Sequence, residues 1–127
     1  MKLRYRGVLA LAGLALAAGA GAQNFPSKPI RIVVPFTPGG PNDIIARLVG
    51  ARYTAAWGQQ TVVDNRPGGG TVIGTDLVAK SAPDGYTLLM VSTSHAANPS
   101  LMPKLPFDTL RDFAAVGQAV SSPNLLV

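Results

Sequence analysis

The sequence contains no cysteine and no glutamate, and His95 is the only histidine among its 127 residues. Without cysteine there are no disulfide bonds, no thiolate metal sites and no cysteine nucleophile. Because no cysteine or glutamate accompanies it, His95 lacks the partners of a metal site, and we expect neither a metal nor another cofactor. The fold must therefore be held together by its apolar core, which a domain of this size supplies only marginally.

Acidic residues are also scarce, since six aspartates face 11 lysines and arginines and give a net charge of +5. Three of the basic residues, Lys2, Arg4 and Arg6, lie within the first 22 residues, so the remainder carries only about +2. The basic residues of that remainder are scattered, without a stripe or interleaved aromatic side chains. This pattern predicts no nucleic-acid partner.

Long apolar runs are absent except near the start of the chain. There a basic beginning is followed by an apolar stretch from Val8 to Ala18 and by Ala20-Gly21-Ala22. This order is typical of a secretory signal peptide over residues 1–22, with cleavage after Ala22. The alternative of an uncleaved anchor is less favoured, because the apolar stretch is too short to span a bilayer as a stable helix.

From residue 25 onward, short apolar runs alternate with segments of helical spacing. Strands are expected at 30–34, 61–64 and 86–91, with a further strand at 114–120. Strands that alternate with helices over short loops predict an α/β fold with a mostly parallel sheet flanked by helices. Asp108 is expected to cap a single helical turn through Phe113.

Two helices are expected between the strands. The first should have Asn42 or Asp43 as its N-cap and should end at Gly58. Its aromatic residues Tyr53 and Trp57 lie at helical spacing and are assigned to the core. The second helix should cover 71–82, with its apolar residues facing inward: Ile73, Leu77 and Val78.

Three turns, at 36–43, 65–71 and 92–98, follow the first three strands and are rich in glycine or hydroxyl groups. In parallel α/β sheets, ligands bind beyond the carboxyl ends of the strands, where these turns meet. Glycine lets backbone N–H groups approach a ligand closely, and helix N-termini favour anions. The turns therefore indicate an anionic ligand. Neither glycine turn matches the dinucleotide or Walker A pattern, so a nucleotide is not expected.

Individual residues in these turns allow more than one interpretation. Each glycine pair could be only a tight turn, and Asp43 could be an N-cap or a ligand contact. Phe36 could line a pocket or the core, whereas Arg66 is interpreted as a structural cation. Ser92, Thr93 and Ser94 are expected to donate hydrogen bonds to the ligand.

An enzyme is the alternative, namely a secreted α/β hydrolase that uses Ser92 or Ser94 with His95. The sequence lacks the G-x-S-x-G elbow around either serine, and no motif supplies an acidic residue to orient His95. We therefore favour a binding protein without catalytic residues.

A set of motifs resembles the tripartite tricarboxylate transporter receptors, the Bug family of periplasmic solute-binding proteins. The resemblance extends over essentially the whole chain after the signal and rests on the order of motifs that are individually weak. These motifs are Pro35-Phe36-x-Pro38-Gly39-Gly40-x-x-Asp43-x-x-Ala46-Arg47, Asn65-Arg66-Pro67-Gly68-x-Gly70-x-x-Ile73-Gly74, Pro83-Asp84-Gly85-Tyr86-Thr87-Leu88, Asn98-Pro99-x-Leu101 and Leu105-Pro106-Phe107-Asp108.

The resemblance implies one lobe of a two-lobed, type II-like periplasmic binding protein that closes around a small carboxylate. Its ligand would be a dicarboxylate, tricarboxylate, acidic amino acid or aromatic acid, delivered to the membrane subunits of a tripartite transporter. Thr71 stands where the family commonly has a further glycine. The implied ligand-binding residues are Phe36, Gly39, Gly40, Asp43, Gly69, Gly70, Thr71, Ile73, Ser92, Thr93 and Ser94.

Members of that family are much longer than this sequence. We therefore expect the first ligand-binding lobe at 23–120 and the start of a crossover to a missing second lobe at 121–127. A truncated receptor remnant without binding activity is the remaining alternative.

Overall fold

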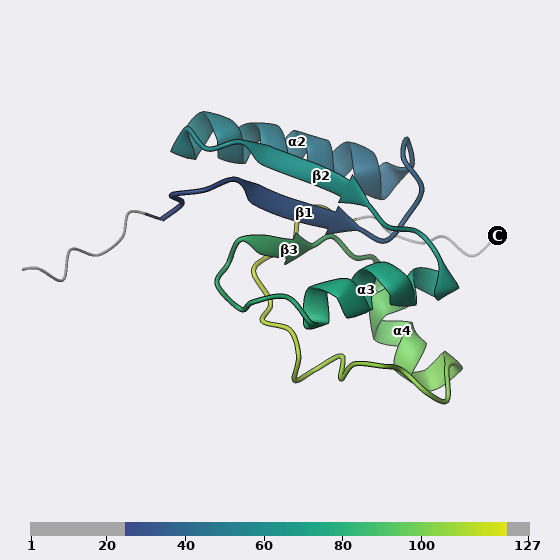
Figure 1. Ribbon diagram of the computed structural model, residues 1–127. Helices are drawn as coiled ribbons and strands as arrows, with labels where there is room; N and C mark the ends of the chain where they lie inside the picture. Colours follow the sequence, from purple (N-terminus) through teal and green to yellow (C-terminus); the bar gives the residue numbers. More distant parts are fainter. Residues whose placement is uncertain (1–24, 122–127) are drawn as a thin grey trace, which may run out of the picture.

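The computed structural model describes residues 25–121 (Figure 1). The expected signal at 1–22 and nearly all of the expected crossover at 121–127 lie outside the described residues. Within 25–121, no helix combines the length and the apolar character needed to cross a membrane.

The centre of the structure is a parallel sheet of three strands in the order β2-β1-β3. Strand β1 covers Ile30–Val34, β2 covers Thr61–Asn65 and β3 covers Thr87–Leu89. The registers pair Ile32 of β1 with Val63 of β2 and with Leu88 of β3. The first three expected strands and the parallel α/β class are thus confirmed, with β3 shorter than expected.

The central strand has four almost fully buried residues, as a nearly continuous apolar run in a parallel sheet should. Ile32 and Val34 pack against Ala46 of helix α2, which covers Pro41–Trp57. Helix α3, Val72–Ala79, contacts β1 and β3 on the other side (Figure 1). The sheet therefore lies between two helical layers, and each of its strands leads into the turn that follows it in the chain.

Helix α2 begins two or three residues earlier than expected. Its N-cap is Gly40 and not Asn42 or Asp43, and Pro41 occupies the first helical position, where its fixed φ suits the helix. The helix ends as expected at Gly58, which is left-handed and donates its N–H to the carbonyl of Thr54.

The aromatic residues near the end of α2 are not core residues. Trp57 is 44% exposed and stacks on Tyr53, and its ring also meets that of Phe25 edge-on. Phe25 in turn packs against Tyr86, with 4.9 Å between ring centroids. These four residues form an aromatic row at the amino end of the sheet, opposite the turns.

The segment after β2 also differs from expectation. A short 3₁₀ helix, η2, covers Gly69–Thr71, and α3 ends at Ala79 instead of residue 82. Ile73 does not face inward but is 57% exposed, because its side chain lies over the glycine turn at Gly68.

The turn expected at 92–98 is instead part of a helix, α4, which covers Thr93–Leu101 and includes Pro99. Serine, threonine, asparagine and proline have low helix propensity, so the sequence favoured a loop there. The strand expected at 114–120 is also wrong, because these exposed residues join no ladder of the three-stranded sheet. The single turn after Asp108 is confirmed: its carboxylate accepts the N–H groups of Leu110 and Arg111.

Candidate functional site

The segments after the three strands leave the same edge of the sheet. The N–H of Arg66, just after β2, donates to the carbonyl of Val34 at the end of β1 over 2.8 Å. On the other side, the N–H of Met90 donates to the carbonyl of Val33 over 2.9 Å. We call the segments 35–40, 66–71 and 90–92 the first, second and third turns. They lead into α2, α3 and α4, so three helix N-termini lie along this edge (Figure 1).

The first turn is fixed by a buried carboxylate. One oxygen of Asp43, Oδ2, accepts the N–H of Gly39 over 2.9 Å and the Nε–H of Arg47 over 3.0 Å. Asp43 is only 3% exposed, and its other oxygen, Oδ1, is buried without a hydrogen-bond partner. The Arg47 hydrogen bond, followed by that of Gly39, lowers the pKa of Asp43 to about 2, so the group is charged at neutral pH.

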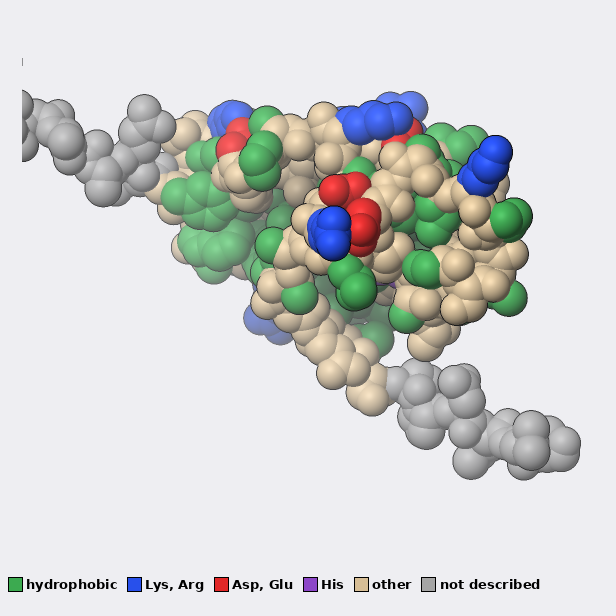
Figure 2. Space-filling model, turned by 90° about the horizontal axis from the view of Figure 1, so that it is seen from below, with side chains coloured by type: hydrophobic (Ala, Val, Ile, Leu, Met, Phe, Trp, Pro, Cys, Tyr) green, Lys and Arg blue, Asp and Glu red, His purple; other side chains and the backbone are tan. Residues whose placement is uncertain are grey.

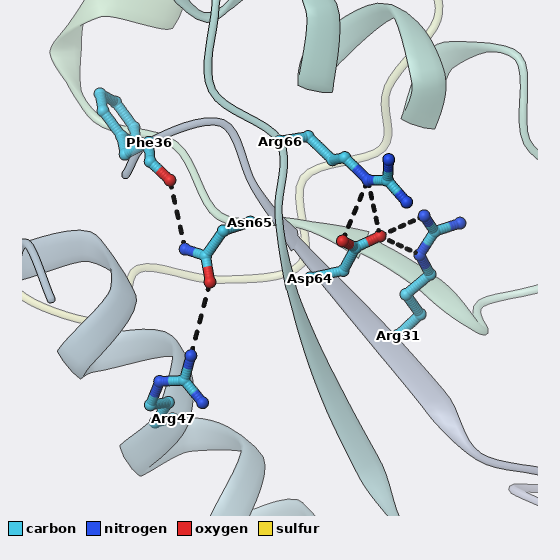
Figure 3. Close-up of polar contacts among 6 residues, drawn as sticks. All are labelled: Arg31, Phe36, Arg47, Asp64, Asn65 and Arg66. Carbon is cyan, nitrogen blue, oxygen red and sulfur yellow. Dashed lines mark hydrogen bonds and ion pairs between the residues drawn. The ribbon is translucent and has the colours of Figure 1, made fainter. Parts of the chain in front are cut away.

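Asn65, the last residue of β2, ties the first turn to α2 (Figure 3). Its Nδ2 donates to the carbonyl of Phe36 over 3.2 Å, and its Oδ1 accepts from Nη2 of Arg47 over 3.4 Å. Because Arg47 also donates to Asp43, the side chains of Asp43, Arg47 and Asn65 are joined by hydrogen bonds. Together they fix the distance between the first turn and the start of the second. Neither Arg47 nor Asn65 was among the expected site residues.

The second turn has an unusual backbone, with positive φ at four consecutive residues: Gly68, Gly69, Gly70 and Thr71. Their positive φ favours glycine at positions 68 to 70. An added Cβ would also lie 2.7 Å from Cδ1 of Ile73 at Gly68 and 2.5 Å from Cε of Met102 at Gly70, so these side-chain ends would have to shift.

Thr71 was expected to be one of the ligand-binding residues. The structure instead buries this side chain, which is 8% exposed, and its Oγ1 accepts a hydrogen bond from Nδ2 of Asn98 over 3.1 Å. Asn98 was also missed as a site residue. No local pattern could have identified it, since its partner lies 27 positions earlier in the chain.

The third turn presents hydroxyl groups. Ser92 is the N-cap of α4, and its Oγ lies 3.1 Å from that of Ser94. Ser92 and Thr93 are exposed, whereas Ser94 is half-buried. All three are thus near the edge, where the sequence analysis expected them to be.

His95 is engaged elsewhere. Its ring stacks on Phe107 at 6.3 Å between centroids and meets Phe113 edge-on at 5.1 Å. Its Nδ1 is buried without a partner, and burial lowers the pKa of the imidazole. Among residues 25–121, no hydrogen bond joins the His95 side chain to Ser92 or Ser94, so the contact that a serine hydrolase needs is not made.

Charged groups near the edge are mostly paired. Asp64 of β2 accepts hydrogen bonds from both Arg66 and Arg31, which agrees with the interpretation of Arg66 as a structural cation (Figure 3). On the face shown in Figure 2, basic side chains are scattered and several adjoin acidic ones. Within the described residues, no group of three or more histidine or aspartate side chains is placed to hold a metal ion.

The three turns form an open edge and not an enclosed cavity. A hollow of about 610 Å³ lies next to α4, lined by side chains between Pro99 and Asp112, and a second of about 520 Å³ lies between α2 and β2. Neither includes the glycines of the first or second turn. A ligand held at the turns would therefore be covered on one side only, and we expect this chain alone to bind it weakly.

Known proteins resemble the chain over most of its length. Residues 45–127 match the family described as the tripartite tricarboxylate transporter family receptor. The chain is 46% identical over 123 residues to the UPF0065 protein in the tcbD-tcbE intergenic region of Pseudomonas sp. strain P51, covering 92% of this chain and 37% of that protein. It is 44% identical over 119 residues to BugT of Bordetella pertussis, with coverages of 92% and 36%. The chain thus spans a little over a third of the length of these curated relatives.

Solved structures show the same fold. A periplasmic transporter is 47% identical with a TM-score of 0.65, covering 68% of this chain and 30% of that one. MatC from Rhodopseudomonas palustris, solved with bound malate, is 40% identical with a TM-score of 0.65, covering 70% and 31%. With its parallel sheet, its two glycine turns and these matches, the chain belongs to the tripartite tricarboxylate transporter receptor family.

Proposed function

We propose that the three turns are the part of a solute receptor that binds one carboxylate group of a small organic acid. The observation that carries this proposal is the set of unused donors at the edge. Within the described residues, the backbone N–H groups of Gly69 and Gly70 have no intramolecular acceptor. Backbone N–H groups in successive left-handed or turn conformations form concave anion sites, which bind a carboxylate without a dedicated cation.

The ligand class follows from the edge and from the relatives. MatC was solved with malate, a dicarboxylate, and its fold matches 70% of this chain, which supports a ligand of this class. We propose a dicarboxylate, tricarboxylate, acidic amino acid or small aromatic acid as the ligand. Its proposed contacts are the residues named from the sequence: Phe36, Gly39, Gly40, Asp43, Gly69, Gly70, Ile73, Ser92, Thr93 and Ser94, with Thr71 acting through its backbone.

Asp43 has a particular place in this proposal. Its charge would repel a carboxylate that approached directly, because the low pKa keeps it ionised. Its unpartnered Oδ1 would accept a hydrogen bond from a bridging water or a ligand donor, while Oδ2 keeps the first turn in place.

The remaining parts of the proposal concern the whole receptor. Export through the expected signal at 1–22 would place the protein in the periplasm, where it would deliver its ligand to the membrane subunits of a tripartite transporter. The lobe at 23–120 would supply one side of the ligand site, and a second surface would close over the open edge. No catalytic step is part of this function.

The test is a nuclear magnetic resonance titration of the 127-residue chain with malate and adipate. Uncharged dimethyl malate serves as the control ligand. We expect both acids to shift the backbone amide signals of residues 39–40, 42–43, 69–73 and 92–94, and dimethyl malate to leave them in place. Shifts confined to the hollow at 99–112, or no shift with either acid, would contradict the proposal.

A further inference from the structure

Thr71 has a backbone conformation that its side chain disfavours. At φ 81° it is the one residue other than glycine with a positive φ in the described part of the chain. A β-branched residue in this region is an outlier, because its Cβ crowds the neighbouring carbonyl oxygen. Such a conformation persists only where surrounding contacts determine it. The second turn must therefore be held by groups outside its own backbone.

Asn98 is the group best placed to hold it. Its side chain extends from α4 and is 5% exposed. The two hydrogens of its Nδ2 are donated to two consecutive residues of the second turn. One donates to the carbonyl of Gly70 over 3.0 Å, and the other donates to Oγ1 of Thr71 over 3.1 Å. The amide of Asn98 thus fixes both the carbonyl of Gly70 and the side chain of Thr71. These two groups lie on either side of the N–Cα bond of Thr71, so holding both fixes its φ.

Two further contacts leave the turn little freedom once Asn98 is in place. Thr75, which is fully buried in α3, donates its hydroxyl to the carbonyl of Thr71 over 2.8 Å. From α4, the methyl group of Met102 lies against Gly70, at the position that a Cβ would occupy. The second turn is therefore held between α3 and α4, and Asn98 is its only polar contact from α4 in the described residues.

We propose that Asn98 is a positioning residue, which holds Thr71 in the left-handed conformation and so directs the free N–H groups of Gly69 and Gly70 toward the ligand. The inference rests on the proposed carboxylate site for its functional consequence. Its conformational part stands independently, since it concerns the backbone of the turn without ligand. Because α4 starts at the third turn, Asn98 also connects the third turn with the second.

The decisive experiment compares two replacements of Thr71, each combined with Asn98→Ala. Thr71→Ala and Thr71→Gly both remove the hydroxyl that Asn98 contacts. Only glycine adopts positive φ without strain. If Asn98 merely adds a hydrogen bond, its loss has the same effect in both backgrounds. If it holds the conformation, its loss disturbs the turn with alanine at 71 and leaves the turn in place with glycine.

The turn is observed in the 127-residue chain by amide hydrogen exchange at Thr71 and Val72, whose N–H groups donate to the carbonyls of Gly68 and Gly69, and by chemical shifts at residues 69–73. We expect Asn98→Ala to speed exchange there by roughly tenfold or more and to lower Tm by roughly 5 °C. With Thr71→Ala the change in exchange persists, and with Thr71→Gly it is largely rescued. The exposed Ser100→Ala on the same helix is the matched control and should change neither quantity.

Malate titrations of the same variants test the functional part. Binding should be lost in Asn98→Ala and in the pair with Thr71→Ala, and should return in the pair with Thr71→Gly.

Equal exchange in the two double variants would overturn the inference. If exchange follows the expectation but no variant, including the parent, binds malate or adipate, the proposed function fails and the positioning role remains. If Asn98→Ala does not fold, folding restored by glycine and not by alanine at 71 supports the inference, whereas two unfolded double variants overturn it.

Discussion

Asp43 shows how a single buried carboxylate organises the first turn. Its Oδ2 joins Gly39 to Arg47, and through Arg47 it joins Asn65 at the end of β2. The residue is spaced four positions from Arg47, so the sequence could have identified this ion pair from helical spacing. The contact to Asn65 depends on how the strand and helix pack, which no local pattern specifies.

The lowered pKa of Asp43 predicts a specific pH dependence of stability. Its pKa in the folded state is about 2, below the usual 3.8, so the charged form favours folding. This contribution is fully present above the usual pKa and is lost as the pH falls through about 2. The Tm difference between the parent and Asp43→Asn should therefore shrink from pH 5 to pH 2. Thermal unfolding measures it, and Asn42→Ala, an uncharged change in the same helical turn, should give a difference independent of pH.

Gly40 provides a test of close backbone approach. Its φ of −77° suits any residue, and an added Cβ would have only the carbonyl oxygen of Thr37 near it, at 3.5 Å. Gly40→Ala should therefore fold normally while its methyl group obstructs the close approach of a ligand to the backbone of the first turn. We expect malate affinity to fall about tenfold or more, with Tm changed by only a few degrees. Gly117→Ala, where nothing lies within 4 Å of the added Cβ, is the matched control. Unchanged affinity in Gly40→Ala would remove this residue from the site.

At the scale of whole elements, α3 approaches the sheet too closely for any residue but glycine at one point. A Cβ at Gly74 would lie 2.8 Å from the carbonyl oxygen of Arg66 and 2.8 Å from Cβ of Pro35. Gly74→Ala should move α3 outward and destabilise the fold by roughly 1–3 kcal/mol, despite the better helix propensity of alanine. Urea unfolding measures this loss, again beside Gly117→Ala. A variant as stable as the parent would show that α3 is not held at this distance.

The elements that the sequence predicted well are those with a strong local pattern. Apolar runs identified β1, β2 and β3, although only β1 is mostly buried, and Gly58 identified the end of α2. Helix α4 was missed because its residues have low helix propensity and its stability comes from contacts such as Asn98 with the second turn. The exposure of Ile73 was missed for a similar reason, since the shape of the glycine turn, and not helical spacing, decides where that side chain lies.

The candidate site was predicted at the level of its turns but not of its contacts. Glycine and hydroxyl residues at the ends of three strands were sufficient to place the edge, and the parallel topology brought the turns together. The role of Thr71 differs because its hydroxyl contacts Asn98, a partner that only the tertiary structure brings within reach.

At the scale of the molecule, the sheet has different contacts at its two ends. The turns lie at the carboxyl end, whereas the aromatic row of Phe25, Tyr53, Trp57 and Tyr86 lies at the amino end. The segment before β1 is also held there by Lys28, which pairs with Asp84 at 2.9 Å, and by the hydrogen bond from the N–H of Ser27 to the Tyr86 hydroxyl.

Because the aromatic row and the turns lie at opposite ends of the sheet, a substitution in the row should change the stability and leave ligand affinity unchanged. Phe25→Ala removes contacts with Trp57 and Tyr86 and should lower the free energy of unfolding by about 1–2 kcal/mol, since Phe25 is 53% exposed and only part of its area is buried. Malate affinity, measured well below the Tm, should equal that of the parent. Phe25→Leu, which keeps much of the apolar contact, should lose less. A weakened affinity in Phe25→Ala would show that the two ends are coupled.

The aromatic row also has a consequence for how such receptors diversify. Because the aromatic row stabilises the fold without contacting the turns, substitutions in the turns are buffered by stability that this row provides. Lineages can then exchange residues at the carboxyl end and acquire new solutes while the scaffold persists.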